Sequence, residues 1–335
     1  MRIGARTIGI VMLMAVTFAS ADPVGWGCFA NYQTIGGMDN WRAHVRLMKE
    51  AGMNTFVLTY GSPEQLAAQI DIAIEEGMLE KTIPVVAMAC CNTVQYATPE
   101  EIAKEPPISG FAPGELYGNA RAYGLARAAS RYSECFPEIV AYTFDEPGRG
   151  EPLEEVTLEA LLDIYAGYKD AGVRLVGALC HPNTRNLFHV VDIPIINTII
   201  GADFAGDKAI LQAAGREFWT YHTALRNYTP SAVRYHVGYW TWACGQRVNL
   251  NWDWAGMLGE QMDIAAPQMN DRLRAYAEGV RDYHYLAATE ERLAELRAYW
   301  GNGDMMPVEW WVSQGRAATC PSPLDLDKLL PERGE

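Results

Sequence analysis

The sequence predicts a (β/α)8 TIM barrel, an α/β fold in which eight parallel strands alternate with helices. Short apolar, β-branched runs alternate with longer amphipathic segments, which is the pattern of repeated βα units. The runs number eight, enough to close a barrel. The 335 residues are 49% hydrophobic and 20% charged, so they can bury one large core. No run is followed by G-x-G-x-x-G, which makes a dinucleotide-binding doubly wound fold a weaker alternative.

The first half of the chain is expected to supply four strands and the helices between them. Trp41, Val45, Met48 and Ala51 share one helical face, and Gly52 ends that helix. The same alternation of patterns continues beyond it. We expect strands at residues 25–30, 55–60, 83–89 and 139–144, with further helices at residues 63–78 and 114–131.

The second half is expected to complete the barrel and extend it. After a helix at residues 153–169, we expect strands at residues 173–179, 193–200, 218–222 and 247–252, with a helical stretch at residues 230–243 before the last. Residues 22–300 would then form a single domain, ending in a helical extension at residues 269–300. Residues 301–335 have the composition of an irregular tail.

The N-terminus has the pattern of a secretory signal peptide. Arg2 and Arg6 precede an apolar run at residues 8–18, and the small residues 19–21 then offer a cleavage site before Asp22. An uncleaved anchor is the alternative, but this run is shorter than the roughly twenty residues that a bilayer requires. We therefore expect a secreted or periplasmic protein with residues 1–21 removed and no membrane span.

Charge and cysteine content exclude several classes of protein. The formal net charge of −14 argues against a nucleic acid partner, which needs a cationic surface. Seven cysteines show no C-x-x-C spacing, and their odd number leaves at least one thiol unpaired. The adjacent Cys90 and Cys91 could be catalytic, although buried small residues at a strand end are the more common case. No motif predicts a metal ion or another cofactor, and the sequence makes no prediction of oligomeric state.

Candidate site residues follow from the fold, because reactive groups of such barrels cluster at the carboxyl ends of the strands. The chain carries acidic, amide, imidazole and aromatic side chains at these ends. They are Asn31, Tyr60, Asn92, Asp145, Glu146, His181, Asp203, His222, Asn251, Trp252, Asp253 and Trp254.

Asp145 and Glu146 are the most informative pair. They end an apolar run, and Pro147 disfavours the helical region for Glu146, so the backbone stays extended through the pair. Two carboxylates held close together tend to raise one pKa, which keeps that acid protonated for general acid catalysis. Both can enter one pocket only if the chain leaves the strand between them. The alternative is a helix cap or an ion pair with Arg149.

Aromatic residues near the last strand favour a carbohydrate ligand, because flat rings can stack on the C–H face of a pyranose. Trp240, Trp242, Trp252 and Trp254 gather there, although packing in a large core would account for many of them. We expect Trp252 or its neighbour Asp253 to line the pocket.

Three further side chains are candidates with common structural alternatives. His181 and His222 could donate hydrogen bonds to substrate, but a lone histidine is more often structural. Asp203 could be a second acid, or the cap of a helix that starts near Asp207.

Three blocks of the sequence resemble the barrel of glycoside hydrolase family 123 and its largely uncharacterised bacterial relatives. They are residues 144–147 (FDEP), residues 239–242 (YWTW) and residues 278–286 (EGVRDYHYL), in that order. The third block is considerably more specific than the first. The family usually carries a β-sandwich before the barrel, whereas here the first expected strand follows closely on the cleavage site.

The resemblance implies a substrate-assisted, retaining hydrolysis of N-acetyl-β-galactosaminides. Asp145 would orient the 2-acetamido group, and Glu146 would protonate the leaving oxygen and later activate water. The strand end at Tyr221-His222-Thr223 offers no carboxylate, which agrees with a mechanism that needs no enzyme nucleophile. Two alternatives stay open: a two-carboxylate glycosidase using Glu146 with Asp203 or Asp253, and a barrel that binds carbohydrate without catalysis.

Overall fold

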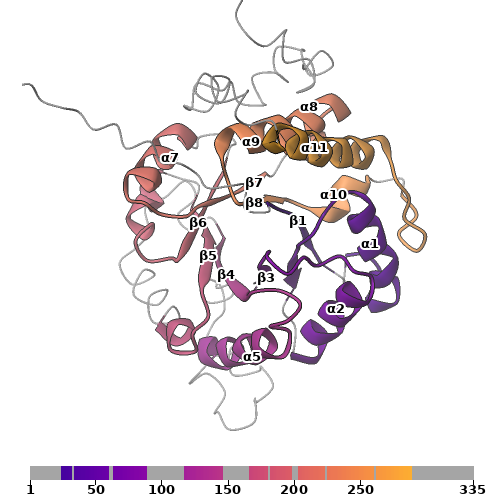
Figure 1. Cartoon of the computed structure of the whole chain (residues 1–335). Coiled ribbons are helices and arrows are strands. Elements are labelled where there is room, and N and C mark those ends of the chain that lie inside the picture. Colours follow the sequence, from indigo (N-terminus) through magenta and orange to yellow (C-terminus); the bar gives the residue numbers. More distant parts are fainter. Residues whose placement is uncertain are drawn as a thin grey trace, which may run out of the picture.

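The computed structural model of the chain is a closed barrel of eight parallel strands, β1 to β8 in sequence order, which confirms the predicted (β/α)8 architecture. Figure 1 looks along the barrel and shows the helices surrounding the strands. The structure describes residues 24–31, 34–59, 63–88, 117–145, 166–179, 182–197, 203–222, 225–259 and 262–288. The strands are β1 (Gly25–Ala30), β2 (Val57–Thr59), β3 (Val85–Met88), β4 (Ile139–Asp145), β5 (Leu175–Ala178), β6 (Ile193–Asn197), β7 (Trp219–His222) and β8 (Val248–Asn251).

The weak first strand closes the barrel against the last. Gly25 lies opposite Val248, and Cys28 lies opposite Asn251, in a parallel pairing of β1 with β8. Because side chains alternate along a strand, each strand sends one row inward and one row toward the helices. The inward rows of all eight strands form one buried cluster, the barrel interior, made of Phe29, Val57, Val86, Val140, Tyr142, Val176, Ala178, Ile193, Ile195, Trp219, Tyr221, Val248 and Leu250.

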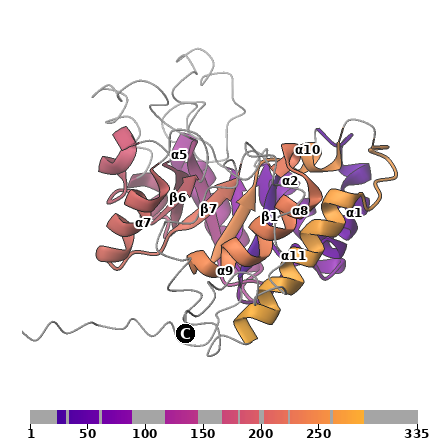
Figure 2. The same ribbon diagram turned by 90° about the horizontal axis from the view of Figure 1, so that it is seen from above.

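Helices follow the strands and cover the outside of the barrel. Figure 2 shows α9, which precedes β8, and α10, which follows it, at opposite ends of the barrel. None of the described helices combines the length and the apolar character needed to cross a membrane. The helices are α1 (Met38–Glu50), α2 (Pro63–Glu75), α5 (Tyr117–Arg131), η1 (Pro182–Leu187), α7 (Phe204–Ala213), η2 (Leu225–Asn227), α8 (Pro230–Tyr235), η3 (His236–Trp240), α9 (Thr241–Cys244), α10 (Trp254–Leu258) and α11 (Asp271–Ala288).

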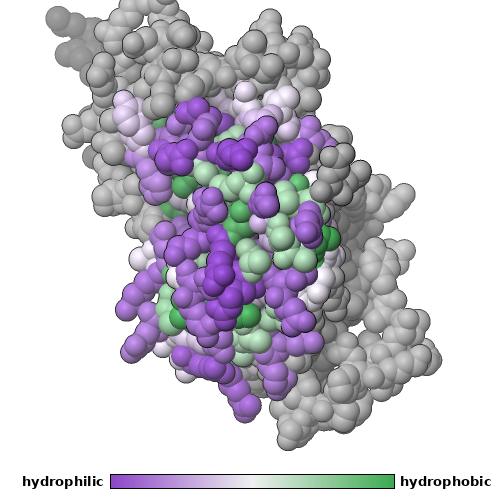
Figure 3. All heavy atoms as spheres, turned by 90° about the vertical axis from the view of Figure 1, so that its right-hand side faces the viewer, coloured by the Kyte–Doolittle hydropathy of each residue, from purple (hydrophilic) through white to green (hydrophobic). Residues whose placement is uncertain are grey.

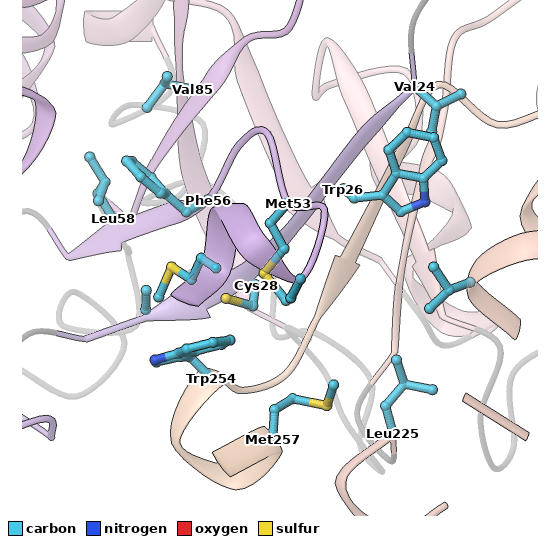
Figure 4. Packing of buried hydrophobic residues seen from close by; sticks show 14 of the residues in the cluster. Val24, Trp26, Cys28, Met53, Phe56, Leu58, Val85, Leu225, Trp254 and Met257 are labelled. Atoms are coloured by element: carbon cyan, nitrogen blue, oxygen red, sulfur yellow. The ribbon is translucent and has the colours of Figure 1, made fainter. Parts of the chain in front are cut away.

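A second, larger buried cluster lies between the strands and the helices. It combines Cys28 of β1, Phe56 before β2, and Trp254 and Met257 of α10 (Figure 4). Cys28, Cys135 and Cys244 carry free thiols, and the other four cysteines lie outside the described residues. Burial raises the pKa of the Cys28 thiol, which therefore acts as a small apolar side chain.

Outside this cluster the helical surface is polar and carries ion pairs. Arg42 and Arg46 of α1 both bind the carboxylate of Glu76, at 2.6 and 2.7 Å, just beyond the end of α2. Figure 3 shows this side of the molecule, where hydrophilic residues predominate. These partly exposed pairs orient α1 against α2 and contribute little to the free energy of unfolding.

The block at residues 278–286 packs α11 against α8 and η3. A Cβ on Gly279 would lie 2.8 Å from the Arg234 carbonyl oxygen, and one on Gly238 would lie 2.7 Å from the Gly279 carbonyl oxygen. Arg234 donates two hydrogen bonds to the buried Asp282 carboxylate, at 2.6 and 2.9 Å, and one to Glu278 at 3.1 Å. The most specific part of the family resemblance therefore serves helix packing.

Candidate functional site

The end of β4 is displaced by one residue relative to β5. Tyr142 lies opposite Val176 and Asp145 lies opposite Ala178, so three steps along β4 match two along β5. The extra residue forms a β-bulge, a feature enriched beside active sites because it re-aims the residues that follow. Its Thr143 is buried, with a hydroxyl donating to the Val176 carbonyl oxygen at 3.5 Å.

This bulge shifts the backbone register of Asp145 by one residue. Tyr142, Val176 and Ala178 all belong to the barrel interior. On a regular strand a residue three positions after Tyr142 would fall in the outward row. The bulge instead sets Asp145 level with Ala178, in register with the inward row at the carboxyl end of the sheet.

Four aromatic side chains form a floor beneath this end of the barrel. Phe29 is the centre, with ring centroids 5.2 Å from Tyr142, 6.2 Å from Tyr221 and 4.9 Å from Trp252. Trp252 packs on the barrel interior and stays half-buried, whereas the other three are buried. In this aromatic floor (Phe29, Tyr142, Tyr221 and Trp252), the half-buried Trp252 is the ring accessible for stacking on a sugar, and the three buried rings support it.

Of the four tryptophans that the sequence places around the last strand, Trp252 alone belongs to the barrel interior. Trp254 lies outside the sheet and donates to His44 Nδ1 at 2.9 Å. Trp240 is buried in the outer cluster, 5.3 Å from Phe204 of α7, so it packs helices together. Trp252 continues the inward alternation of Leu250, whereas Trp254 begins α10 and no longer follows the strand.

Asp253 has a structural role at the start of α10. Its carboxylate accepts a hydrogen bond from the Gly256 amide at 2.9 Å and forms the N-cap of the helix. A capping carboxylate satisfies helix amides that have no intrahelical partner. This hydrogen bond favours a structural role over that of a second catalytic acid.

Asp203 has a similar role at the start of α7. It accepts a hydrogen bond from the Gly206 amide at 3.1 Å and pairs with Arg185 at 2.7 Å. These contacts, the Arg185 pair foremost, lower the pKa of Asp203 and keep it ionised. The helix begins at Phe204, which supports the capping alternative given by the sequence.

His222 occupies the outward row of β7, because Trp219 and Tyr221 fill the inward one. It is buried against the helices, with its ring centroid 3.7 Å from that of His236 in η3 and 5.4 Å from that of Tyr228. The side chain thus lies on the opposite side of β7 from the barrel interior. Tyr60, Asn92, Glu146 and His181 lie outside the described residues.

The rings of His222 and His236 form a buried imidazole pair. All four of their nitrogen atoms are without a hydrogen-bond partner among the residues that the structure describes. Burial lowers the pKa of His222 to about 3, and burial together with the neighbouring His222 holds the pKa of His236 well below its ordinary value. Both rings are neutral at physiological pH. Within the described part of the chain, no group of three or more potential metal-ligating side chains comes together.

Buried polar contacts that no sequence pattern indicated support the ends of β1 and β8. Asn251 donates to the Gly27 carbonyl oxygen at 3.1 Å and to the Tyr276 hydroxyl at 3.0 Å. His44 was also missed. Its Nε2 donates to the Ile264 carbonyl oxygen at 2.9 Å, and its Nδ1 accepts from Trp254, so a single neutral tautomer satisfies both contacts. A histidine on the apolar face of residues 41–51 was the available signal.

The chain matches no known protein-family model and no curated protein sequence. The resemblance to family 123 therefore stays a prediction. Solved structures to which the fold is similar include a family 39 glycoside hydrolase from the gut symbiont Bacteroides cellulosilyticus WH2, with 13% identity and a TM-score of 0.48 over 77% of this chain and 63% of that chain.

Two further structures are similar at comparable levels. One is the family 30 subfamily 8 xylanase Xyn30A from Clostridium acetobutylicum, with 12% identity and a TM-score of 0.46 over 76% of this chain and 70% of that chain. The other is the catalytic domain of a β-amylase from Paenibacillus polymyxa, with 10% identity and a TM-score of 0.48 over 80% of this chain and 99% of that domain. The chain's own residues must therefore carry the argument for a reaction.

Proposed function

We propose that this protein is a secreted glycoside hydrolase that cleaves β-linked, N-acetylated hexosaminides by a substrate-assisted, retaining mechanism. The observation that carries the proposal is the β4 bulge, which sets Asp145 in register with Ala178 of the inward row. Glu146 follows Asp145 directly. The aromatic floor lies beneath the same end of the barrel, and its half-buried Trp252 offers a ring for a sugar to stack on.

In the proposed reaction the substrate supplies the nucleophile. The 2-acetamido carbonyl oxygen attacks the anomeric carbon as the bond to the leaving oxygen breaks, and Glu146 gives its proton to that oxygen. Asp145 accepts a hydrogen bond from the acetamido N–H and stabilises the positive charge that develops on this group. Water then attacks the anomeric carbon as its bond to the acetamido oxygen breaks, which restores the acetamido group. The proton of the water passes to Glu146, and the product keeps the β configuration.

The capping roles of Asp203 and Asp253 support substrate assistance over a two-carboxylate mechanism. Asp203 already pairs with Arg185, and Asp253 accepts from the Gly256 amide. A retaining enzyme with its own nucleophile needs a second carboxyl group about 5 to 5.5 Å from the acid. The contacts of these two candidates give each carboxylate a structural role in its helix.

Hydrolysis of aryl N-acetyl-β-galactosaminide and aryl N-acetyl-β-glucosaminide tests the proposal. Because general acid–base catalysis contributes about 10²–10⁴-fold, we expect Glu146→Gln to lower kcat by at least the lower figure with a natural leaving group. Asp145→Asn should lower kcat on both aryl substrates. An aryl β-galactoside with a 2-hydroxyl should be inert, and a thiazoline analogue should inhibit competitively. Equal rates for wild type and both variants would remove the pair from the mechanism.

A further inference from the structure

A large cleft borders the barrel on the side of β1, β7 and β8. Its volume is about 1330 Å³, and its lining comes from the segments that follow β1, β7 and β8. These segments leave the carboxyl ends of their strands, so the cleft opens at the same end of the barrel as Asp145. The cleft is built from residues that the proposed reaction does not use.

Hydrogen bonds between α10 and α11 hold one wall of the cleft in place. Arg272 donates to the Gly256 carbonyl oxygen at 3.1 Å, and Asn270 donates to the carbonyl oxygens of Met257 and Leu258 at 3.0 and 2.9 Å. These carbonyls end α10 and would otherwise be unpaired. The wall is therefore preformed, as in most small-molecule sites.

A second anchor fixes the segment between α10 and α11. His44 of α1 donates to the Ile264 carbonyl oxygen at 2.9 Å and accepts from Trp254 of α10 at the same distance. Ile264 and its neighbour Asp263 line the cleft. Together with the contacts of Arg272, this anchor ties the outer side of the cleft to α1, α10 and α11.

The lining combines hydrogen-bonding side chains with an apolar strip. Asn227 and Gln268 are exposed, and their amide groups make no hydrogen bond within the described part of the chain. Two carboxylates, Asp263 and Asp271, and one cation, Arg272, line the cleft. Arg272 makes no ion pair among the described residues. This balance disfavours a polyanion, whereas amides and carboxylates suit hydroxyl groups that both donate and accept. Ile35, Leu258 and Met262 add apolar surface suited to C–H faces.

We propose that this cleft is an accessory binding site for several consecutive sugar residues of an oligosaccharide, so that the substrate is a glycan chain. The inference rests on the proposed function for the sugar at the barrel mouth. Size supports it, because the cleft exceeds the roughly 300–1,000 Å³ of sites that hold one small ligand. The rigid wall formed by Arg272 and Asn270 lowers the entropic cost of binding a chain.

Calorimetry with a chain-length series tests the cleft. The probes are the β-1,4-linked dimer and hexamer of N-acetylglucosamine, titrated into the full chain carrying Glu146→Gln to prevent turnover. We expect the hexamer to bind at least tenfold more tightly than the dimer, and this gain in affinity is the increment attributed to the cleft. Ala266→Trp should remove this increment, because Ala266 is an exposed residue of the lining. Gln268→Ala should reduce it severalfold, while dimer binding stays unchanged in both variants.

Ala213→Trp is the matched control, because Ala213 is an exposed alanine on α7 and does not line the cleft. It should keep the full increment. Equal affinities for dimer and hexamer would overturn the accessory site, as would an increment that survives Ala266→Trp. If wild type hydrolyses no aryl glycoside while the increment depends on Ala266, the proposed function fails and the cleft stands.

Discussion

The imidazole rings of His222 on β7 and His236 on η3 lie with their centroids 3.7 Å apart and their planes at 75°, buried between the sheet and the helices. None of their four nitrogen atoms has a hydrogen-bond partner within the described segments of the chain. Trp240 stacks on His236 at 4.5 Å, so the pair cannot reach solvent without disturbing η3. A buried neutral pair of this kind couples stability to pH.

The pair predicts that the protein loses stability in acid. The folded pKa of His222 is about 3, and that of His236 is also lowered, against 6.5 in the unfolded chain. The unfolded state therefore binds more protons below pH 6.5, and the free energy of unfolding falls as the pH drops. Each histidine contributes about 1.4 kcal/mol per pH unit well below the unfolded pKa.

Urea unfolding at pH 7, 6 and 5 measures this slope. His236→Phe keeps an aromatic ring against Trp240 and removes one titrating group, so its slope should be shallower by about 1.4 kcal/mol per pH unit at the acid end. His189→Gln is the control, because His189 is exposed. Identical slopes for wild type and His236→Phe would refute the assignment.

Gly279→Ala should destabilise the protein although alanine favours helices. The added methyl group would meet the Arg234 carbonyl oxygen and the Val237 Cβ, each 2.8 Å away. Overpacking of this kind costs about 1–3 kcal/mol, which outweighs a gain in helix propensity of about 1 kcal/mol. Thermal unfolding checks it, with the exposed neighbour Arg281→Ala as control. A variant more stable than wild type would show that α11 moves freely against η3.

Arg234→Met should cost about 3–5 kcal/mol, because it leaves the Asp282 carboxylate buried without its cation. The double variant Arg234→Met with Asp282→Leu should recover much of this loss, since no buried charge then remains. A double-mutant cycle by urea unfolding gives the coupling between the two residues. Purely additive losses would indicate that the pair is not coupled.

Asp253→Ala separates the two hydrolytic mechanisms. Loss of the N-cap of α10 should lower stability by about 1 kcal/mol. The ratio kcat/KM for aryl N-acetyl-β-glucosaminide should stay within about twofold of wild type, because a cap takes no part in the chemistry. A loss of several orders of magnitude would restore Asp253 as the nucleophile of a two-carboxylate enzyme.

Periodicity predicted the architecture well and the local geometry less well. The strand at residues 25–30 has the expected bounds, and the helix expected at residues 114–131 is described from Tyr117 to Arg131. The helical stretch at residues 230–243 is divided into α8, η3 and α9, because η3 is π-helical. Gly238 of η3 packs closely on Gly279 of α11. The two glycines are distant in sequence, so no local pattern reveals this contact.

The candidate site could be predicted only in part. The acidic pair at the end of β4 follows from the strand pattern, and the inward position of Trp252 follows from alternation. The aromatic floor required knowing which strands meet across the barrel. Neither cap could be distinguished from a catalytic acid by sequence, because aspartate serves both roles.

The extra residue in β4 shifts the inward–outward alternation at the end of the strand by one position relative to the residues before it. Ala141 and Tyr142 pair with β5 before the insertion. Phe144 and Asp145 pair with it after the insertion, one position out of step. Deleting Thr143 should leave a regular strand in which Asp145, then two positions after Tyr142, stays opposite Ala178. One inserted residue is thus absorbed at a single backbone step, without disturbing the architecture that supports it.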